Sequence, residues 1–128
     1  MLIPVSAILF CVLSSVVILF HTCLIAGLPW GEATMGGRYP GKLPISMRFF
    51  SLFSILVIAA FVAIILAASK LWLQRLQSFA DQTIWYLVGA LAIMTFSNMI
   101  TPSAIERQLW APVIGLMLVS GAIVAWLA

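Results

Sequence analysis

Four long apolar runs, separated by short polar connections, limit what this chain can fold into more than any other feature. Crossing a bilayer as a helix takes about 20 apolar residues, because the hydrocarbon core is about 30 Å thick and each residue rises about 1.5 Å. We expect spans at residues 3–28, 49–73, 83–100 and 109–128. Only 7% of the residues are charged, which is too few to cover a water-soluble domain of this length. The sequence therefore predicts an all-α fold, a membrane-spanning four-helix bundle that forms one domain over residues 1–128.

The three connections differ in composition. The first, residues 29–47, is rich in glycine and proline, which break helices and favour turns, so it predicts an ordered loop or a re-entrant element. The second, residues 70–82, mixes polar with apolar side chains and is expected at the membrane interface, and the third, residues 101–108, predicts a tight hairpin. No basic residue precedes the first run and no cleavage site follows it, so we expect a retained span, not a signal peptide.

Four spans place the first and third connections on one side of the membrane and the second connection, with both termini, on the other. Basic residues favour the cytoplasmic side. The first and third connections with their helix ends carry Arg38, Lys42, Arg48 and Arg107, against Lys70 and Arg75 in the second. We therefore expect an inner-membrane protein of bacterial type, with the first and third connections in the cytoplasm.

Small residues recur on two of the predicted spans. Ala59, Ala63 and Ala67 follow one another at intervals of four, and Gly115 and Gly121 lie in the last span. Small side chains let helix backbones approach closely, which is how helices pack in lipid. We expect these positions to make helix contacts.

The expected topology gathers most polar side chains at one membrane face: Glu32, Arg38, Arg48, Asn98, Glu106 and Arg107. One interpretation is a site for an anionic headgroup or a small anion, because arginine binds carboxylates and phosphates with paired hydrogen bonds. The favoured interpretation is a structural clasp, in which a glutamate of one connection pairs with an arginine to hold the loop onto the hairpin.

His21 is the only histidine, and it lies inside the first predicted span. A buried imidazole needs a partner, so His21 is a candidate proton-relay group, haem ligand or hydrogen-bond partner of another helix. We favour the structural role, with Thr95, Ser97 or Asn98 as partner.

No catalytic residue and no metal site is predicted. No nucleophile has a histidine or carboxylate at a recognisable spacing, and no phosphate-binding glycine pattern occurs. The net charge of +3 reflects residues that flank the spans, so membrane lipid and other membrane chains are the expected partners, and nucleic acid is not. The sequence leaves the cofactor open.

Several motifs resemble a group of short bacterial four-span membrane proteins: Pro29-Trp30-Gly31-Glu32, Gly36-Gly37, Leu43-Pro44, Arg48 and Glu106-Arg107-Gln108-Leu109-Trp110-Ala111-Pro112-Val113. The resemblance covers nearly the whole chain and implies no activity. It implies that the first connection and the hairpin are recurring features, and that a histidine often precedes the Pro-Trp-Gly element, as His21 does here.

Three functions fit the sequence. The favoured one is a non-catalytic accessory or scaffold subunit that docks to other membrane chains, because intramembrane ionisable residues are almost absent. The alternative is a protein that binds or transports a small molecule, such as a lipid, quinone, haem or anion, through His21, Asn98 and the polar face. An enzyme that uses Glu32 or Glu106 as acid or base is the least favoured.

Overall fold

The computed structural model describes all 128 residues and confirms the predicted all-α fold. It contains four long helices, and each is long and apolar enough to cross a membrane. They are α1 (Leu2–Ile25), α2 (Ile45–Ala68), α3 (Gln77–Ile100) and α4 (Ala111–Leu127), with the short helices η1 (Gly31–Ala33), η2 (Met35–Gly37), η3 (Gln74–Leu76) and η4 (Glu106–Trp110).

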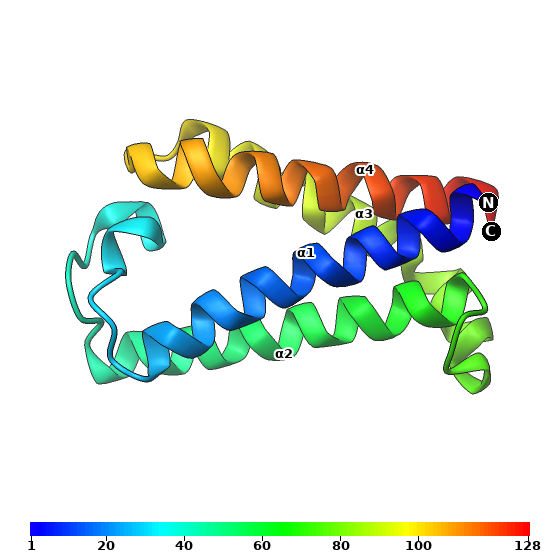
Figure 1. Ribbon diagram of the computed structural model, residues 1–128, viewed down its shortest axis with the longest axis horizontal. Coiled ribbons are helices and arrows are strands. Elements are labelled where there is room, and N and C mark those ends of the chain that lie inside the picture. The colour runs from blue at the N-terminus through cyan, green and yellow to red at the C-terminus, as the bar shows by residue number, and fades with distance from the viewer.

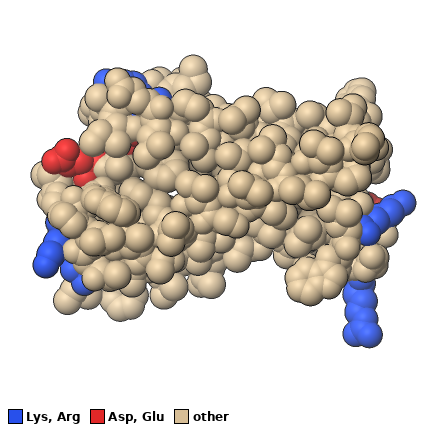
Figure 2. Space-filling model, viewed as in Figure 1, with Lys and Arg blue, Asp and Glu red and all other residues tan.

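The helices form an elongated bundle with both termini at one end (Figure 1). Helix α1 runs diagonally, from a position beside α4 near the termini to a position beside α2 at the opposite end. The connection from α1 to α2 lies at that opposite end, where it folds inward between the helix ends (Figure 1). On the face seen in Figure 2, charged side chains occur only at the two ends, as expected for a bundle with an apolar belt.

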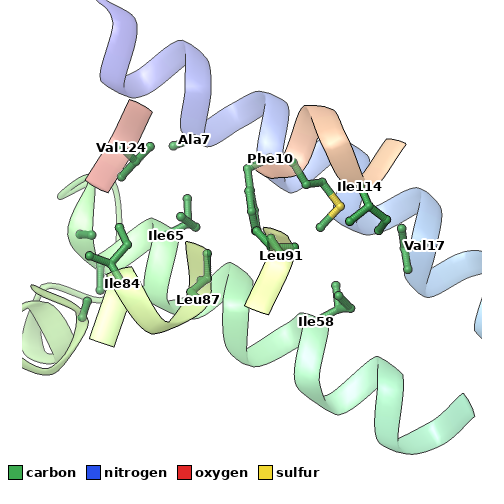
Figure 3. Packing of buried hydrophobic residues seen from close by; sticks show 14 of the residues in the cluster. Ala7, Phe10, Val17, Ile58, Ile65, Ile84, Leu87, Leu91, Ile114 and Val124 are labelled. Carbon is green, nitrogen blue, oxygen red and sulfur yellow. The ribbon is translucent and has the colours of Figure 1, made fainter. Parts of the chain in front are cut away.

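The core is built from apolar side chains of all four helices. Phe10 of α1, Ile65 of α2, Leu91 of α3 and Met117 of α4 are 2% exposed or less. Figure 3 shows these helices converging on the same cluster. Most other large apolar side chains are exposed, which is the pattern of a helix bundle whose outer surface faces lipid.

Two helices begin before their predicted spans, and α2 also ends earlier than predicted, at Ala68 and not at residue 73. Helix α2 begins at Ile45, directly after Pro44, and α3 begins at Gln77 and so includes the second half of the predicted interfacial connection. Residues 77–82 contain neither glycine nor proline, so the helix continues into the polar sequence. The second connection is therefore shorter than expected, from Ser69 to Leu76.

A wide π-helical turn, η4, opens the last span inside the predicted hairpin. Pro112 follows it directly and has no N–H, and in a regular helix its ring would collide with the carbonyl group four residues earlier, that of Gln108. A π-turn relieves such a conflict. The Ala111 N–H accordingly bonds the Glu106 carbonyl, five residues back.

The small residues take different positions in the bundle. Gly121 is buried, and a Cβ atom added there would lie 3.5 Å from both Phe10 and Leu87, whereas one at Gly115 would lie 3.7 Å from Thr95. On α2, Ala67 is buried, Ala63 is half-buried and Ala59 is exposed. Of the three alanines, Ala67 and in part Ala63 therefore pack within this chain, and Ala59 does not.

We predict that Gly121→Leu destabilises the bundle by about 1–3 kcal/mol, because the larger side chain overpacks the contact of α4 with α1 and α3. Gly89→Leu is the matched control, since nothing lies within 4 Å of a Cβ atom at this exposed helical position. Unfolding in mixed micelles of mild detergent and SDS measures both, and equal losses would contradict the packing.

Candidate ligand-binding site

The first connection is an ordered loop that depends on its glycines. The Gly31 N–H donates to the Gly41 carbonyl oxygen at 2.9 Å, and a Cβ atom at Gly31 would lie 1.9 Å from the Tyr39 carbonyl oxygen. Gly36 and Gly37 both have positive φ angles, 69° and 73°, which glycine adopts without strain. These residues fold the loop back on itself.

Two side chains of the hairpin hold the loop against it, and we call this contact the clasp. The Gly36 N–H donates to Oε1 of Glu106 at 2.6 Å, and the Ser103 hydroxyl donates to the Glu32 carbonyl oxygen at 2.6 Å. The same hydroxyl accepts from the Glu106 N–H at 3.3 Å. The clasp thus joins two segments that are about 70 residues apart in sequence, through Ser103 and Glu106 on one side and Glu32 and Gly36 on the other.

The sequence predicted the clasp with different partners. Arg48 donates from Nε to the Leu43 carbonyl oxygen at 3.0 Å, and Arg107 donates to the Thr101 carbonyl oxygen. Each arginine therefore braces its own connection. The contact between the loop and the hairpin therefore contains no pair of glutamate and arginine. The side chains of the hairpin bond backbone groups of the loop instead, because backbone N–H and C=O groups in irregular segments also need partners.

Glu32 and Arg38 are exposed side chains of the loop, and Arg107 is exposed on the hairpin, whereas Glu106 is 7% exposed. The six polar residues expected at one membrane face thus lie near the same end of the bundle without forming one cluster. Of the six, only Asn98 and Glu106 line the cavity described next.

A cavity of about 390 Å³ lies between the four helices and the loop, next to the clasp. It is lined by Val17, Phe20, His21, Ala33, Thr34, Met35, Phe50, Phe53, Ser54, Val57, Ile58, Ile93, Met94, Ser97, Asn98, Glu106, Trp110 and Ile114. Val17, Ile58 and Ile114 also belong to the buried core, and Figure 3 shows them approaching from three helices. The cavity begins where the core ends, and residues 33–35 of the loop close its other end.

Aromatic rings form one wall of the cavity. The Phe20 ring centroid lies 4.6 Å from that of Trp110 and 5.5 Å from that of His21. Trp30 stacks on Phe20 from the loop side, with centroids 6.4 Å apart and an angle of 3° between the ring planes. The π-turn brings Trp110 to this wall, one helical turn after Glu106.

Two buried polar atoms in the walls of the cavity have no hydrogen-bond partner: Nδ1 of His21 and Nε1 of Trp110. None of the three partners expected for His21 bonds it. Asn98 donates to the Met94 carbonyl oxygen at 2.8 Å and Thr95 to that of Leu91 at 2.7 Å, and Ser97 makes no hydrogen bond to His21. Buried polar groups without partners are rare in native proteins and often occur at functional sites.

The cavity opens between α2 and α3. Phe50 and Phe53 of α2 are 52% and 60% exposed, and Ile93 of α3 is 70% exposed, although all three line the cavity. In a membrane this surface faces the lipid chains. A molecule dissolved in the bilayer could therefore enter from the side.

Sequence reasoning singled out His21, Asn98 and Glu106 but missed Ser103, Phe20 and Trp110. Ser103 is followed by Glu106 at the spacing of a capping box, the pattern of a serine and a glutamate that opens a helix. That pattern was the available signal for Ser103. Apolar periodicity gives no comparable signal for an aromatic residue at a cavity.

Comparison of the chain with protein-family models, with curated proteins and with solved structures found no match. The resemblance to short bacterial four-span proteins stays a prediction.

We predict that Ser103→Ala lowers stability by about 1–3 kcal/mol, because it removes the hydroxyl that bonds the Glu32 carbonyl oxygen and the Glu106 N–H, and leaves the part-buried Glu32 carbonyl group without this donor. Ser15→Ala is the matched control, since the exposed Ser15 hydroxyl bonds only the Cys11 carbonyl oxygen of its own helix. Unfolding in mixed micelles and cleavage of the loop by added protease measure the effect. Equal stability and equal cleavage of the two variants would contradict a contribution of the Ser103 hydrogen bonds to the clasp.

Proposed function

We propose that this chain is a membrane-embedded binding protein for a lipid-soluble small molecule. The observation that carries the proposal is the cavity of about 390 Å³, with its predominantly apolar wall and its opening between α2 and α3. Small-molecule sites are typically of this size, mostly apolar, with a few polar groups that orient the ligand. They also occur preferentially between the helices of bundles.

The arrangement of polar groups supports the proposal. Two kinds of group line the cavity: the polar groups of Thr34, Asn98 and Glu106 with the unpartnered nitrogen atoms of His21 and Trp110, and the exposed rings of Phe50 and Phe53 at its opening. A ligand with a polar group and an apolar body would match both regions. An unsatisfied buried donor costs about 1–3 kcal/mol, so a ligand that accepted its hydrogen bond would offset that cost.

The loop supplies a means of closing the site. Residues 33–35 cover one end of the cavity, and the clasp holds the neighbouring Gly36. The loop is attached to the hairpin by the hydrogen bonds of the clasp, and its apolar contacts with the bundle are limited to the buried Ala33 and Leu43 and the stack of Trp30 on Phe20. Release of the clasp would therefore free the cover without unfolding the helices.

We further propose that the site lies near the cytoplasmic face of a bacterial inner membrane. The clasp, the loop and the hairpin lie at the end of the bundle opposite the termini. Four basic residues accompany these connections, against two in the connection at the other end, and basic residues favour the cytoplasm.

A second proposal, an accessory subunit that docks to other membrane chains, is supported by α2. Ala59 is exposed and Ala63 half-buried, so these small residues remain free to contact a helix of another chain.

One experiment tests both proposals. The tagged chain is purified in mild detergent from its own membranes, and mass spectrometry identifies the lipophilic compounds and the protein chains that come with it. We predict that the wild type carries a lipid-soluble compound, that Ser54→Trp loses it because the indole fills the cavity, and that Leu52→Trp retains it. Leu52 is the matched control, because it is 45% exposed on the same helix and does not line the cavity.

Equal amounts of compound in the three proteins would contradict the binding proposal. Stoichiometric protein chains in all three preparations would instead support the accessory subunit, and their absence would count against it.

A further inference from the structure

The cavity contains one formally charged side chain, and it is negative. Glu106 is the only Asp, Glu, Lys or Arg residue among the eighteen that line the cavity. One carboxylate oxygen accepts the Gly36 N–H at 2.6 Å. The other oxygen accepts no hydrogen bond from the protein and is not among the enclosed atoms, unlike Nδ1 of His21 and Nε1 of Trp110.

No cationic side chain of the protein neutralises this carboxylate. Arg48 and Arg107 donate to carbonyl oxygens of their own connections, and neither lines the cavity. His21 shares the cavity, but its Nδ1 atom makes no hydrogen bond. Burial of a carboxylate without a counter-charge is unfavourable, and a bound cation would relieve it.

The remaining walls also suit a cation. Phe20, Phe50, Phe53 and Trp110 line the same cavity as Glu106. The faces of aromatic rings attract cations, and aromatic cages bind quaternary ammonium groups in this way. A weakly hydrated cation with an apolar body loses little by leaving water, whereas an anion would meet the carboxylate directly.

From the sole carboxylate and the aromatic walls we infer that the ligand of this cavity is a lipophilic cation, such as a substituted ammonium compound. Its charge lies beside Glu106, and its apolar groups extend between Phe50 and Phe53 toward the lipid. This inference rests on the proposed binding function and adds the charge of the ligand. It disagrees with the site for an anionic headgroup, which was one interpretation of the polar residues at this end of the bundle.

The test uses the purified full-length chain in nanodiscs of phosphatidylcholine, whose headgroup carries no net charge. The probes are tetraphenylphosphonium and tetraphenylborate, two ions of nearly the same shape and opposite charge. Equilibrium binding of each labelled ion is measured against empty nanodiscs. We expect saturable binding of tetraphenylphosphonium and none of tetraphenylborate.

Two glutamate variants locate the charge. Glu106→Gln keeps the size of the side chain and an oxygen that can accept the Gly36 N–H, and it should weaken binding of the cation about tenfold or more. Glu32→Gln makes the same change of charge at an exposed residue of the first connection, which does not line the cavity. It should change the dissociation constant by less than about twofold, because exposed charges are screened by solvent.

Equal binding of the two ions, no saturable binding of the cation, or equal effects of the two variants would each overturn the inference. If Glu106→Gln fails to fold, the comparison of the two ions on the wild type decides alone. A neutral compound that co-purifies with the wild type and is lost in Ser54→Trp would leave the binding function standing while the cation inference fails.

Discussion

The hydrogen bond from the Gly36 N–H to the Glu106 carboxylate connects the two irregular segments on which the site depends. Helix packing alone would leave a nineteen-residue connection, residues 26–44, free at the end of the bundle. The clasp instead holds residues 33–35 over the cavity and places a carboxylate in its wall. One side chain thus has two effects, since the same carboxyl group fixes the loop and sets the charge of the cavity. A structural clasp and a binding site are therefore compatible in this protein.

The position of Glu106 follows from a backbone conflict a few residues later. In a regular helix the Pro112 ring would collide with the Gln108 carbonyl group, and the chain here widens into the π-turn Glu106–Trp110. That turn buries both Glu106 and Trp110, each 7% exposed. Pro112 therefore helps to determine which side chains of this turn, Glu106 and Trp110, line the cavity.

Much of the fold could be predicted from the sequence, because membrane crossing leaves few alternatives to four helices with polar connections. The shared membrane end of the loop and hairpin also followed from the number of spans. The clasp partners did not, since Gly36 and Glu32 contribute backbone atoms, which composition does not distinguish. The isolation of His21 was not predicted either, since none of the expected partners Thr95, Ser97 and Asn98 bonds it; Thr95 and Asn98 bond their own helix instead. The cavity was also unpredictable, because it depends on how far the helices diverge around the loop.

The attachment of the loop to the hairpin is tested most directly by amide hydrogen exchange of the loop glycines, measured by NMR on the glycine-labelled chain in nanodiscs. The Gly36 N–H is bonded to Glu106, whereas the Gly41 N–H donates no hydrogen bond and serves as the internal reference. We expect that Gly36 exchanges much more slowly than Gly41, and that Glu106→Ala removes the difference. Exchange of Gly36 as fast as that of Gly41 in the wild type would contradict it, because the loop would then not be fixed to the hairpin.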